Sequence, residues 1–560
     1  MLDANKTKNT KINSKGVKPV VLLVLDGWGL APPSQGNALH LANTPNIDKY
    51  PLTYPSGQLI ASGESVGLPA NTVGNSEVGH LTLGAGRVVY QSLTKIDNEI
   101  EKRKFFENKA LFSAIKHAKD HDSRLHLIGL TGSGYVHSST EHFYALLELC
   151  KRNKFDNYYF HLMTDGRDAP PQDGINVIRK IDEIYPGKIV SLTGRYYGMD
   201  RDKRWERTQK AYQAMVSGKG DVVGNPIDAI RKAYEAGKTD EFIEPSVVVK
   251  DGKPIATIDD NDACIFFNFR VDRPRQLTMA FTIPDFENLK NFKLDFNPHH
   301  DETRPLKKEE EVSGTFKREK IPQNLHFVTM TEYQKKIPVS AVAYPTQTVQ
   351  MPLPEAISKS GLTQFCLAES EKERMVTYYY RGQRGDPYAG EEYHIEPSPK
   401  VKTYDLQPEM SLYKVLEKFK EMVAKDKFNF YFINFANTDM VGHTGILEAG
   451  IKAAEHVDIC VGEMVENVLS KDGTIIIIAD HGNSDEMIKF PATSFFYTSQ
   501  KGEVSTEHSN NPVPIYILNN SLRGNTRKIP QGSLSDLAPT VMSLLGLPIP
   551  KEMTGRNLLE

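Results

Sequence analysis

The feature that most constrains this fold is a repeated pattern in which an apolar run of strand length ends in an aspartate. Three runs share it: V-V-L-L-V-L-D ends at Asp26, F-N-F-Y-F-I-N-F-A-N-T-D ends at Asp439, and T-I-I-I-I-A-D-H ends at Asp480 and His481. Uninterrupted apolar runs with helical segments between them are typical of parallel sheets in α/β proteins. Because ligand-binding residues gather at the carboxyl ends of such strands, we expect these aspartates at one edge of a single sheet.

The middle of the chain repeats this pattern, but there the ends of three strand-like runs carry arginines. These are Arg167 (with Asp168 beside it), Arg195, Arg201, Arg270 and Arg273. Guanidinium groups bind phosphate and carboxylate through paired hydrogen bonds, so five of them predict a small, multiply anionic substrate; singly, each is better explained by a surface salt bridge. We predict a second α/β domain at residues 91–345, inserted into a first domain that comprises residues 19–90 and 346–560.

Length and composition agree with a two-domain globular protein. At 560 residues the chain is too long for one ordinary core, and 39% hydrophobic with 25% charged residues is typical of soluble proteins. Its 68 basic and 71 acidic residues nearly cancel. This balance argues against nucleic acid or a membrane surface as a partner, so anion recognition must be local.

The four cysteines are far apart and form no C-x-x-C pair, which indicates reduced thiols in a cytoplasmic protein rather than a disulfide framework or zinc site. No window approaches transmembrane length. Residues 1–18 carry five lysines and predict a disordered basic tail, since the apolar run after them is too short for a signal peptide. The charged segment 297–324 predicts a flexible surface excursion; its His299, His300 and Asp301 could bind a metal, but a solvated loop is favoured.

Acidic and imidazole side chains recur in the C-terminal part. Asp439 and His443 are four residues apart, Asp480 and His481 are adjacent, and His508 precedes another strand-like run. Any one of these would be read as a cap or a structural residue. Together with Asp26 they predict a site for two metal ions, and a set rich in carboxylates favours Mn²⁺ over Zn²⁺ or Fe.

The stretch N-T-V-G-N-S-E-V-G-H places Ser76 where a glycine-rich loop enters a helix. One interpretation is a helix cap, because serine accepts N–H groups of a first turn. The other is a nucleophile placed where helix N–H groups favour a phosphate. Two metal ions are the usual device for displacement at phosphorus, so the second interpretation explains more, although the two are compatible.

Longer motifs point to a known family. They are L-D-G-W-G, G-N-S-E-V-G-H, V-H-S, D-G-R-D, G-R-Y-Y-G-M-D-R-D-K-R-W, F-N-F-R-V-D-R, A-E-S-E-K, P-S-P-K-V-K-T-Y-D-L-Q-P-E-M-S, N-T-D-M-V-G-H-T-G and A-D-H-G-N. From about Val20 onward the chain resembles the 2,3-bisphosphoglycerate-independent (cofactor-independent) phosphoglycerate mutases of the alkaline phosphatase superfamily. The resemblance implies a monomeric, two-domain enzyme that interconverts 3-phosphoglycerate and 2-phosphoglycerate in glycolysis and gluconeogenesis.

The resemblance also implies roles for individual residues. One Mn²⁺ site would comprise Asp26, Ser76, Asp480 and His481, and the other Asp439, His443 and His508, with Co²⁺ or Mg²⁺ as alternative metals and no 2,3-bisphosphoglycerate. Ser76 would become a phosphoserine, Lys372 would stabilise the phosphoryl group in transit, and Asp168 would be the general acid/base. The clamp for carboxylate and phosphate would comprise His137, Arg167, Arg195, Arg201, Arg270 and Arg273.

The chain departs from the family pattern at several places. T-G-S-G-Y-V-H-S at residues 131–138 lacks an aspartate before His137, Val271 replaces a proline between two arginines, and Met375 replaces a histidine. Segments 297–324 and 490–506 are longer than usual. No metal ligand or nucleophile is lost, which disfavours an inactive binding protein. A phosphatase or phosphopentomutase would share the metal core, and the arginine-bearing domain favours the mutase over both.

Overall fold

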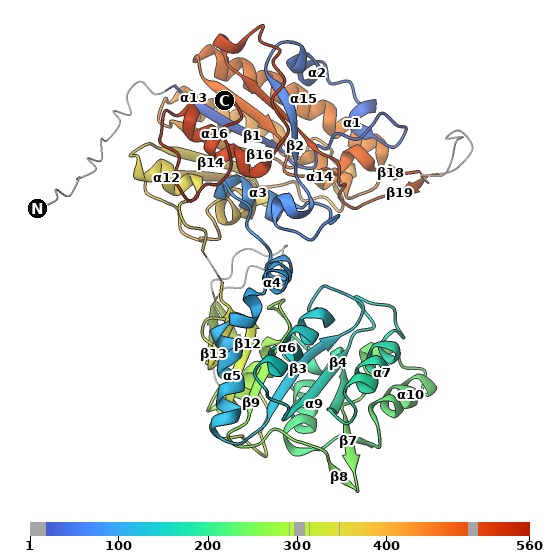
Figure 1. Cartoon of the computed structure of the whole chain (residues 1–560). Coiled ribbons are helices and arrows are strands. Elements are labelled where there is room, and N and C mark those ends of the chain that lie inside the picture. The colour runs from blue at the N-terminus through green and yellow to red at the C-terminus, as the bar shows by residue number, and fades with distance from the viewer. Residues whose placement is uncertain (1–17, 290–291, 296–308, 313, 347, 491–501) are drawn as a thin grey trace, which may run out of the picture. The chain divides into compact units, whose positions relative to one another are not determined.

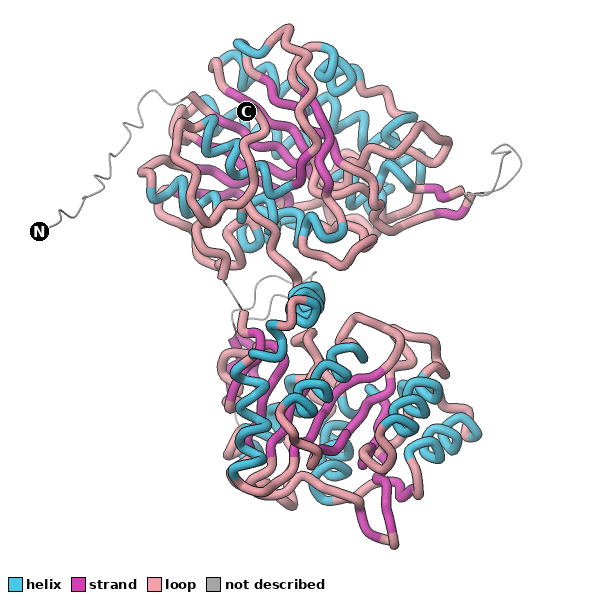
Figure 2. The backbone as a smooth tube through the Cα atoms, viewed as in Figure 1, coloured by secondary structure: helices cyan, strands magenta, loops and turns pink. Residues whose placement is uncertain are grey.

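The computed structural model describes residues 18–289, 292–295, 309–312, 314–346, 348–490 and 502–560. The chain forms two compact units: unit 1 comprises Met1–Gln91 and Thr348–Glu560, and unit 2 comprises Ser92–Gln347. In each unit, strands form the centre and helices lie outside them (Figure 2). The basic tail predicted at residues 1–18 lies outside the described residues except for Lys18.

Unit 1 contains an eight-stranded sheet in the order β15-β14-β16-β1-β17-β20-β2-β21. The strands are β15 (Glu391–Glu396), β14 (Gln364–Glu369), β16 (Phe430–Phe435), β1 (Val20–Leu25), β17 (Thr474–Ile478), β20 (Val513–Leu518), β2 (Ser56–Ile60) and β21 (Gly532–Ser533). The first five are parallel, whereas β20 runs antiparallel to both β17 and β2. The predicted parallel-sheet class is therefore confirmed, and β16, β1 and β17 are immediate neighbours.

The runs are largely apolar because these strands are covered on both faces; every residue of β1, β16 and β17 is buried. The helices form two groups that cover the sheet (Figure 1). One group comprises α1 (Ala38–Leu41), α2 (Pro45–Lys49), α13 (Leu412–Ala424), α14 (Asn437–Gly442) and α15 (Leu447–Ser470). The other comprises α3 (Ser76–Ala85), α12 (Leu353–Lys359) and α16 (Leu537–Leu544).

Unit 2 contains a second sheet, in the order β13-β12-β9-β3-β4-β5-β7-β6, with β8 paired to β7. The strands are β13 (Ala341–Tyr344), β12 (His326–Thr331), β9 (Ala263–Phe266), β3 (Leu125–Thr131), β4 (Tyr158–Thr164), β5 (Ile189–Gly194), β7 (Ser246–Lys250), β6 (Asp221–Val223) and β8 (Lys253–Pro254). From β13 to β5 they are parallel. Alternate side chains of β3 enter two different apolar clusters, Leu125 and Leu127 one and Ile128 and Leu130 the other, so the sheet separates two cores.

The helices of unit 2 are α4 (Ser92–Glu101), α5 (Lys109–Asp120), α6 (Thr140–Arg152), α7 (Gly174–Ile184), α8 (Arg195–Gly198), α9 (Trp205–Ser217), α10 (Pro226–Glu235) and α11 (Arg275–Thr282). Part of the predicted excursion is ordered: β11 (Glu309–Val312) pairs with β10 (Phe292–Asp295). His299, His300 and Asp301 lie outside the described residues. In the longer segment 490–506, β19 (Glu503–Val504) pairs with β18 (Ile488–Lys489).

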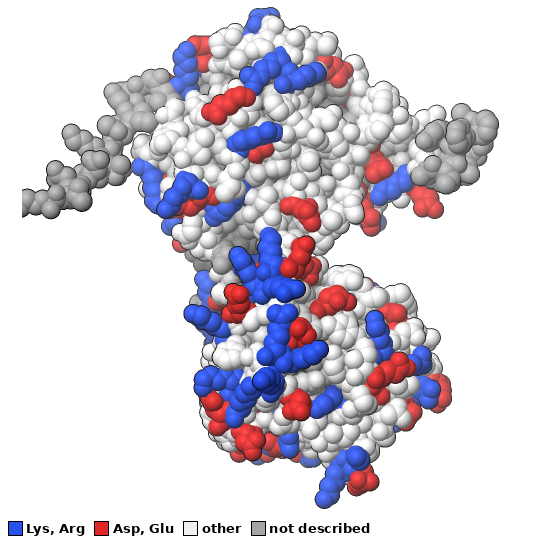
Figure 3. Space-filling model, in the orientation of Figure 1, with Lys and Arg blue, Asp and Glu red and all other residues white. Residues whose placement is uncertain are grey.

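Three global expectations can be compared with the structure. On the face shown in Figure 3, acidic and basic side chains lie side by side on each unit, in agreement with the balanced totals. All four cysteines are buried and none forms a disulfide among the described residues. Within the same residues, no helix is long and apolar enough to cross a membrane.

Candidate functional site

The carboxyl ends of β1, β16 and β17 bring three buried aspartates to one edge of the unit 1 sheet. Asp26 directly follows β1, Asp480 follows β17, and Asp439 lies in the first turn of α14, after β16. Gly27 has a φ of +76°, and a Cβ there would lie 2.8 Å from the Cα of Asp439. The turn after β1 therefore requires glycine, because this lets the segments that carry Asp26 and Asp439 approach closely.

Ser76 is the first residue of α3, but it does not cap the helix. The Asn75 side chain accepts the Val78 N–H at 3.1 Å, so the capping interpretation of Ser76 is wrong and Asn75 has that role. The Ser76 hydroxyl donates instead to Asp26 Oδ1 at 3.2 Å and lies 2.9 Å from His481 Nε2. The hydroxyl is thus held among the predicted metal ligands.

Lys372 reaches the same point from the turn Ser370–Lys372, directly after β14. Its Nζ donates to Asp26 Oδ1 at 2.7 Å, Asp439 Oδ2 at 2.6 Å and Ser76 Oγ at 2.8 Å. Burial opposes the charge on Lys372, but the neighbouring aspartates outweigh it and raise the pKa of the ammonium well above its ordinary value. Lys372 is therefore a permanent buried cation in contact with the serine oxygen.

His443 and His508 face each other beside Asp439. His443 Nδ1 donates to the Thr506 carbonyl at 2.7 Å, and His508 Nδ1 donates to the Gly74 carbonyl at 2.8 Å. The two Nε2 atoms are 3.1 Å apart, and each lies 3.3 Å from Asp439 Oδ1. In neutral imidazoles with Nδ1 protonated, Nε2 carries a lone pair. Two imidazole lone pairs and a carboxylate oxygen that meet at one point can serve as ligands of a metal cation.

His481 lies between the two groups of ligands. Its Nε2 is 3.3 Å from Asp26 Oδ1, 3.6 Å from Asp480 Oδ2 and 4.0 Å from Asp439 Oδ1. Burial lowers its pKa, but the aspartates, Asp480 foremost, outweigh it and raise the pKa of His481 to about 9. Both this shift and the buried Asp480 Oδ2, which accepts no hydrogen bond from the described residues, indicate a site that favours positive charge.

In unit 1 the geometry adds two residues that sequence reasoning missed, His80 and Asn434. Ligand atoms of Asp439, His481 and His508 lie within 4.8 Å of one another, and so do those of Asp26, His80 and Asp480. His80 donates from Nδ1 to the Ser76 carbonyl at 2.9 Å, and Asn434 donates to His80 Nε2 at 3.1 Å and to Asp26 Oδ2 at 2.7 Å. His80 belongs to the G-N-S-E-V-G-H motif, four residues after Ser76, which is the signal that could have identified it.

In unit 2, Arg195 directly follows β5 and is buried. It donates to Asp165 Oδ1 at 2.6 Å, to Asp168 Oδ2 at 2.5 Å and to His137 Nε2 at 2.9 Å. Burial and the charge of Arg195 lower the pKa of His137 to about 3, so the imidazole is neutral and carries its proton on Nδ1. Burial raises the pKa of Asp168, but Arg195 outweighs it and the net shift is downward.

Two of the other arginines meet at Asp272, a buried residue that the sequence analysis did not select. Arg201 Nη1 donates to Asp272 Oδ2 at 2.7 Å, and Arg270 Nε lies 3.2 Å from Asp272 Oδ1. The His137 Nδ1 lies 3.7 Å from the same carboxylate. Asp272 therefore joins two predicted clamp arginines to the group around Arg195. Asp165 and Asp272 had no distinguishing signal apart from their places inside D-G-R-D and R-V-D-R.

Arg273 and Arg167 complete the cluster. Arg273 donates to the Met199 carbonyl at 3.2 Å, and burial followed by the charges of Arg195 and Arg201 lowers its pKa to about 10. Arg167 is more exposed, 3.5 Å from Glu241. The loop that lacks the usual aspartate comes close to the cluster: a Cβ on Gly134 would lie 2.5 Å from the Asp168 carbonyl. Val271 packs at the edge of an apolar cluster, and Met375 begins a π-helix, Met375–Tyr379.

Comparisons with known proteins agree with this arrangement. Residues 96–335 match the family described as BPG-independent PGAM N-terminus, and residues 291–533 match type I phosphodiesterase / nucleotide pyrophosphatase. The chain is 45% identical over 546 residues to a 2,3-bisphosphoglycerate-independent phosphoglycerate mutase of Clostridium beijerinckii, covering 97% of this chain and 99% of the relative. A mutase of the same name from Clostridium acetobutylicum is 45% identical over 548 residues, with the same coverage.

A solved structure is also similar over nearly the whole chain. The structure of Leishmania mexicana phosphoglycerate mutase at low cobalt concentration has a TM-score of 0.60 and 29% identity, covering 96% of this chain and 97% of that chain. The identity to the two clostridial relatives, over almost their full length, shows the family. The chain therefore belongs to the family of 2,3-bisphosphoglycerate-independent phosphoglycerate mutases.

Proposed function

We propose that this protein interconverts 3-phosphoglycerate and 2-phosphoglycerate through a phosphoserine on Ser76. The observation that carries the proposal is the position of the Ser76 hydroxyl. It does not cap α3, and it lies 2.8 Å from Lys372 Nζ and 2.9 Å from His481 Nε2. A buried cation beside a serine oxygen lowers the cost of its negative charge as it attacks phosphorus. This supports a nucleophilic role over a structural one.

We further propose that unit 1 binds two Mn²⁺ ions, with Co²⁺ or Mg²⁺ as alternatives. Asp26, Ser76, Asp480 and His481 would hold one ion and Asp439, His443 and His508 the other. The facing Nε2 lone pairs of His443 and His508 fit this assignment, and so does Asp480 Oδ2, which accepts no hydrogen bond from the residues that the structure describes. Bound divalent ions would lower the pKa of the serine hydroxyl and neutralise phosphoryl oxygens.

The residues of unit 2 would hold the glycerate while its phosphoryl group is on Ser76. Arg195, Arg201, Arg270 and Arg273, with Arg167 and His137, would bind its carboxylate and the phosphate of the substrate. Asp168 would exchange one proton between the two glycerate hydroxyls, giving it to the oxygen that leaves phosphorus and taking it from the oxygen that attacks. Lys372 would stabilise the negative charge of the phosphoryl group both during transfer to Ser76 and during its return to glycerate.

A metal site that activates a phosphoserine for transfer would also activate it for attack by water, so we propose that the two units act on one substrate molecule and keep water out. We propose that they close around glycerate during transfer, with hinges near Tyr90–Gln91 and Tyr344–Pro345, between a metal-binding domain (19–90 and 346–560) and a substrate domain (91–345). We also propose a monomer in the cytoplasm that needs no 2,3-bisphosphoglycerate. The four buried, unpaired cysteines support a reducing compartment.

The test is an assay of purified protein with Mn²⁺ and 3-phosphoglycerate, without bisphosphoglycerate, following 2-phosphoglycerate and free phosphate together. We expect 2-phosphoglycerate with little phosphate. In Ser76→Ala we expect transfer to be lost while Mn²⁺ binding persists, because six of the seven proposed ligands remain. Phosphate without the isomer would instead indicate a phosphatase, and full activity of Ser76→Ala would exclude the phosphoserine.

A further inference from the structure

Asp165 lies where several of the proposed substrate-binding residues of unit 2 meet. It directly follows β4 and is buried. Its Oδ1 accepts the backbone N–H of Arg167 at 3.2 Å, that of Asp168 at 3.0 Å and a proton of Arg195 Nη1 at 2.6 Å. No step of the proposed reaction passes through Asp165, so this convergence of contacts needs a separate explanation.

The loop that leads to His137 encloses the other side of Asp165. A Cβ on Gly132 would lie 3.4 Å from the Asp165 Cβ, and a Cβ on Gly134 would lie 3.3 Å from Asp165 Oδ2. The Asp165 side chain is accordingly only 3% exposed, whereas that of Asp168 is 25% exposed. Of the two aspartates that contact Arg195, Asp168 is therefore the one that a ligand can reach, and Asp165 is fixed in the protein.

Arg195 needs both aspartates to balance its charge. It is buried, and one nitrogen, Nη1, donates to Asp165 and to Asp168. In the proposed reaction Asp168 carries a proton for part of each cycle, and a neutral carboxyl group is a weaker partner for a guanidinium than a carboxylate. A buried cation that loses its anionic partner is strongly destabilised. Arg195 would then leave its position unless a second carboxylate stayed beside it.

We propose that Asp165 is a positioning residue for the mutase reaction: it holds the Arg195 guanidinium and the Arg167–Asp168 turn in place while Asp168 is protonated. Asp165 itself exchanges no proton. Asp168 gives one proton to the glycerate oxygen that leaves phosphorus and takes it back from the hydroxyl that attacks. This role rests on the proposed function, because it requires Asp168 to be the general acid/base.

Asp165→Asn separates the two contributions of this side chain. The amide oxygen can still accept the N–H groups of Arg167 and Asp168, but the negative charge beside Arg195 is lost. Arg195 then depends on Asp168, which binds its proton more weakly as a result. We expect kcat to fall by about 10², with the KM for 3-phosphoglycerate within about threefold of wild type. A solvent deuterium isotope effect on kcat should appear or increase, because proton transfer becomes limiting.

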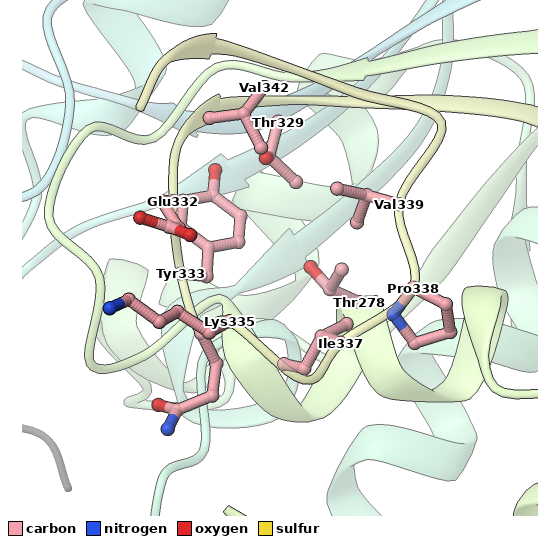
Figure 4. A pocket seen from close by; sticks show the side chains of 10 residues that line it. Thr278, Thr329, Glu332, Tyr333, Lys335, Ile337, Pro338, Val339 and Val342 are labelled. Carbon is pink, nitrogen blue, oxygen red and sulfur yellow. The ribbon is translucent and has the colours of Figure 1, made fainter. Parts of the chain in front are cut away.

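Two control variants remove a carboxylate charge elsewhere in unit 2. Asp262→Asn changes an equally buried aspartate, which accepts two backbone N–H groups before β9, at the opposite edge of the sheet. Glu332→Gln changes a residue of the hollow between α11 and the chain that connects β12 to β13 (Figure 4), which none of the proposed substrate-binding residues lines. Its amide can still accept the Thr346 N–H. Both variants should keep the wild-type kcat and isotope effect. Only Asp262→Asn should lose stability, because an amide has one acceptor oxygen where this carboxylate uses two.

Calorimetric titration of 3-phosphoglycerate into the full chain in EDTA shows whether the binding residues of unit 2 are still in place. We expect Asp165→Asn to keep the wild-type Kd within about threefold. A loss of this binding together with kcat, whether through misfolding or local collapse, would overturn the proposal, because Asp165 would then only build the site. Wild-type kcat in Asp165→Asn, or a lower kcat without a change in the isotope effect, would overturn it as well.

A failure of the proposed function is recognised separately, in the wild-type chain. If wild type with Mn²⁺ forms no 2-phosphoglycerate from 3-phosphoglycerate, the mutase assignment is wrong and the role of Asp165 falls with it. If wild type is active and Asp165→Asn equals it, only the role of Asp165 is wrong.

Discussion

At the scale of single residues, Lys372 balances the buried charge of unit 1, because its Nζ contacts Asp26, Asp439 and Ser76. In Lys372→Met we expect kcat to fall by about 10²–10³, since the variant lacks the cation beside the transferring group. Without metal the aspartates lose their partner, so the variant should be less stable by about 3–5 kcal/mol in EDTA. Turnover and calorimetric Tm, each with Mn²⁺ and with EDTA, measure both effects. Lys359→Met is the control, because it removes only surface contacts of Lys359 Nζ, with Glu355 and with the Met351 sulfur. Wild-type kcat in Lys372→Met would contradict the proposed role of Lys372.

Glu369 is a second single residue with a predictable effect: it makes the stability of the folded state depend on pH. It is buried, with Oε1 accepting the Ser411 N–H at 2.9 Å, and burial raises its pKa from 4.5 to about 7. The folded state therefore holds a proton that the unfolded chain releases near pH 4.5. The protonated Glu369 therefore stabilises the folded state by at most about 3 kcal/mol. This stabilisation is fully present below pH 4.5, decreases as the pH rises toward 7 and is absent above pH 7. Chemical denaturation at pH 5 and 8 should show a smaller difference for Glu369→Gln than for wild type; an equal difference would assign the pH dependence elsewhere.

At the scale of elements, α3 carries Ser76 and must pack closely against the segment that follows Lys372. A Cβ on Gly84 of α3 would lie 2.3 Å from the Tyr380 carbonyl oxygen, directly after the π-helix Met375–Tyr379. Gly84→Ala should push these elements apart, destabilise the fold by about 1–3 kcal/mol and reduce kcat at temperatures where the variant is still folded. Gly385→Ala, where a Cβ meets nothing within 4 Å, should leave stability and turnover unchanged. Equal effects of the two substitutions would rule out this packing constraint.

Elements and strand-end residues were the most predictable features of this chain. The β1 run and the four isoleucines of β17 are apolar because both faces of these strands are buried, and that pattern, with its terminal aspartates, is readable without a structure. Asp272, Asn434 and Asp165 were not found, because an isolated Asp or Asn has many ordinary roles and each of these contacts at least one residue 30 or more positions away in the sequence. The capping of α3 by Asn75 instead of Ser76 depends on a one-residue difference in where the helix begins. Sequence patterns resolve such boundaries poorly.

At the scale of the whole molecule, the two units have separate cores, so ligands should stabilise them separately. The proposed metal ligands are all in unit 1, and a ligand that binds only the folded form stabilises it in proportion to the logarithm of its concentration. Calorimetry with increasing Mn²⁺ should therefore move the unfolding transition of unit 1 upward and leave that of unit 2 in place. Hydrogen exchange would assign the transitions, with added protection at the ends of β1, β16 and β17 and none at β3 and β4.

EDTA should reverse the shift, whereas 3-phosphoglycerate without metal should protect the residues around Arg195. Equal stabilisation of both units by Mn²⁺ alone would mean either that the two units unfold together or that a metal ion also binds in unit 2. Hydrogen exchange would distinguish these two outcomes, because only a metal in unit 2 would add local protection at β3 and β4.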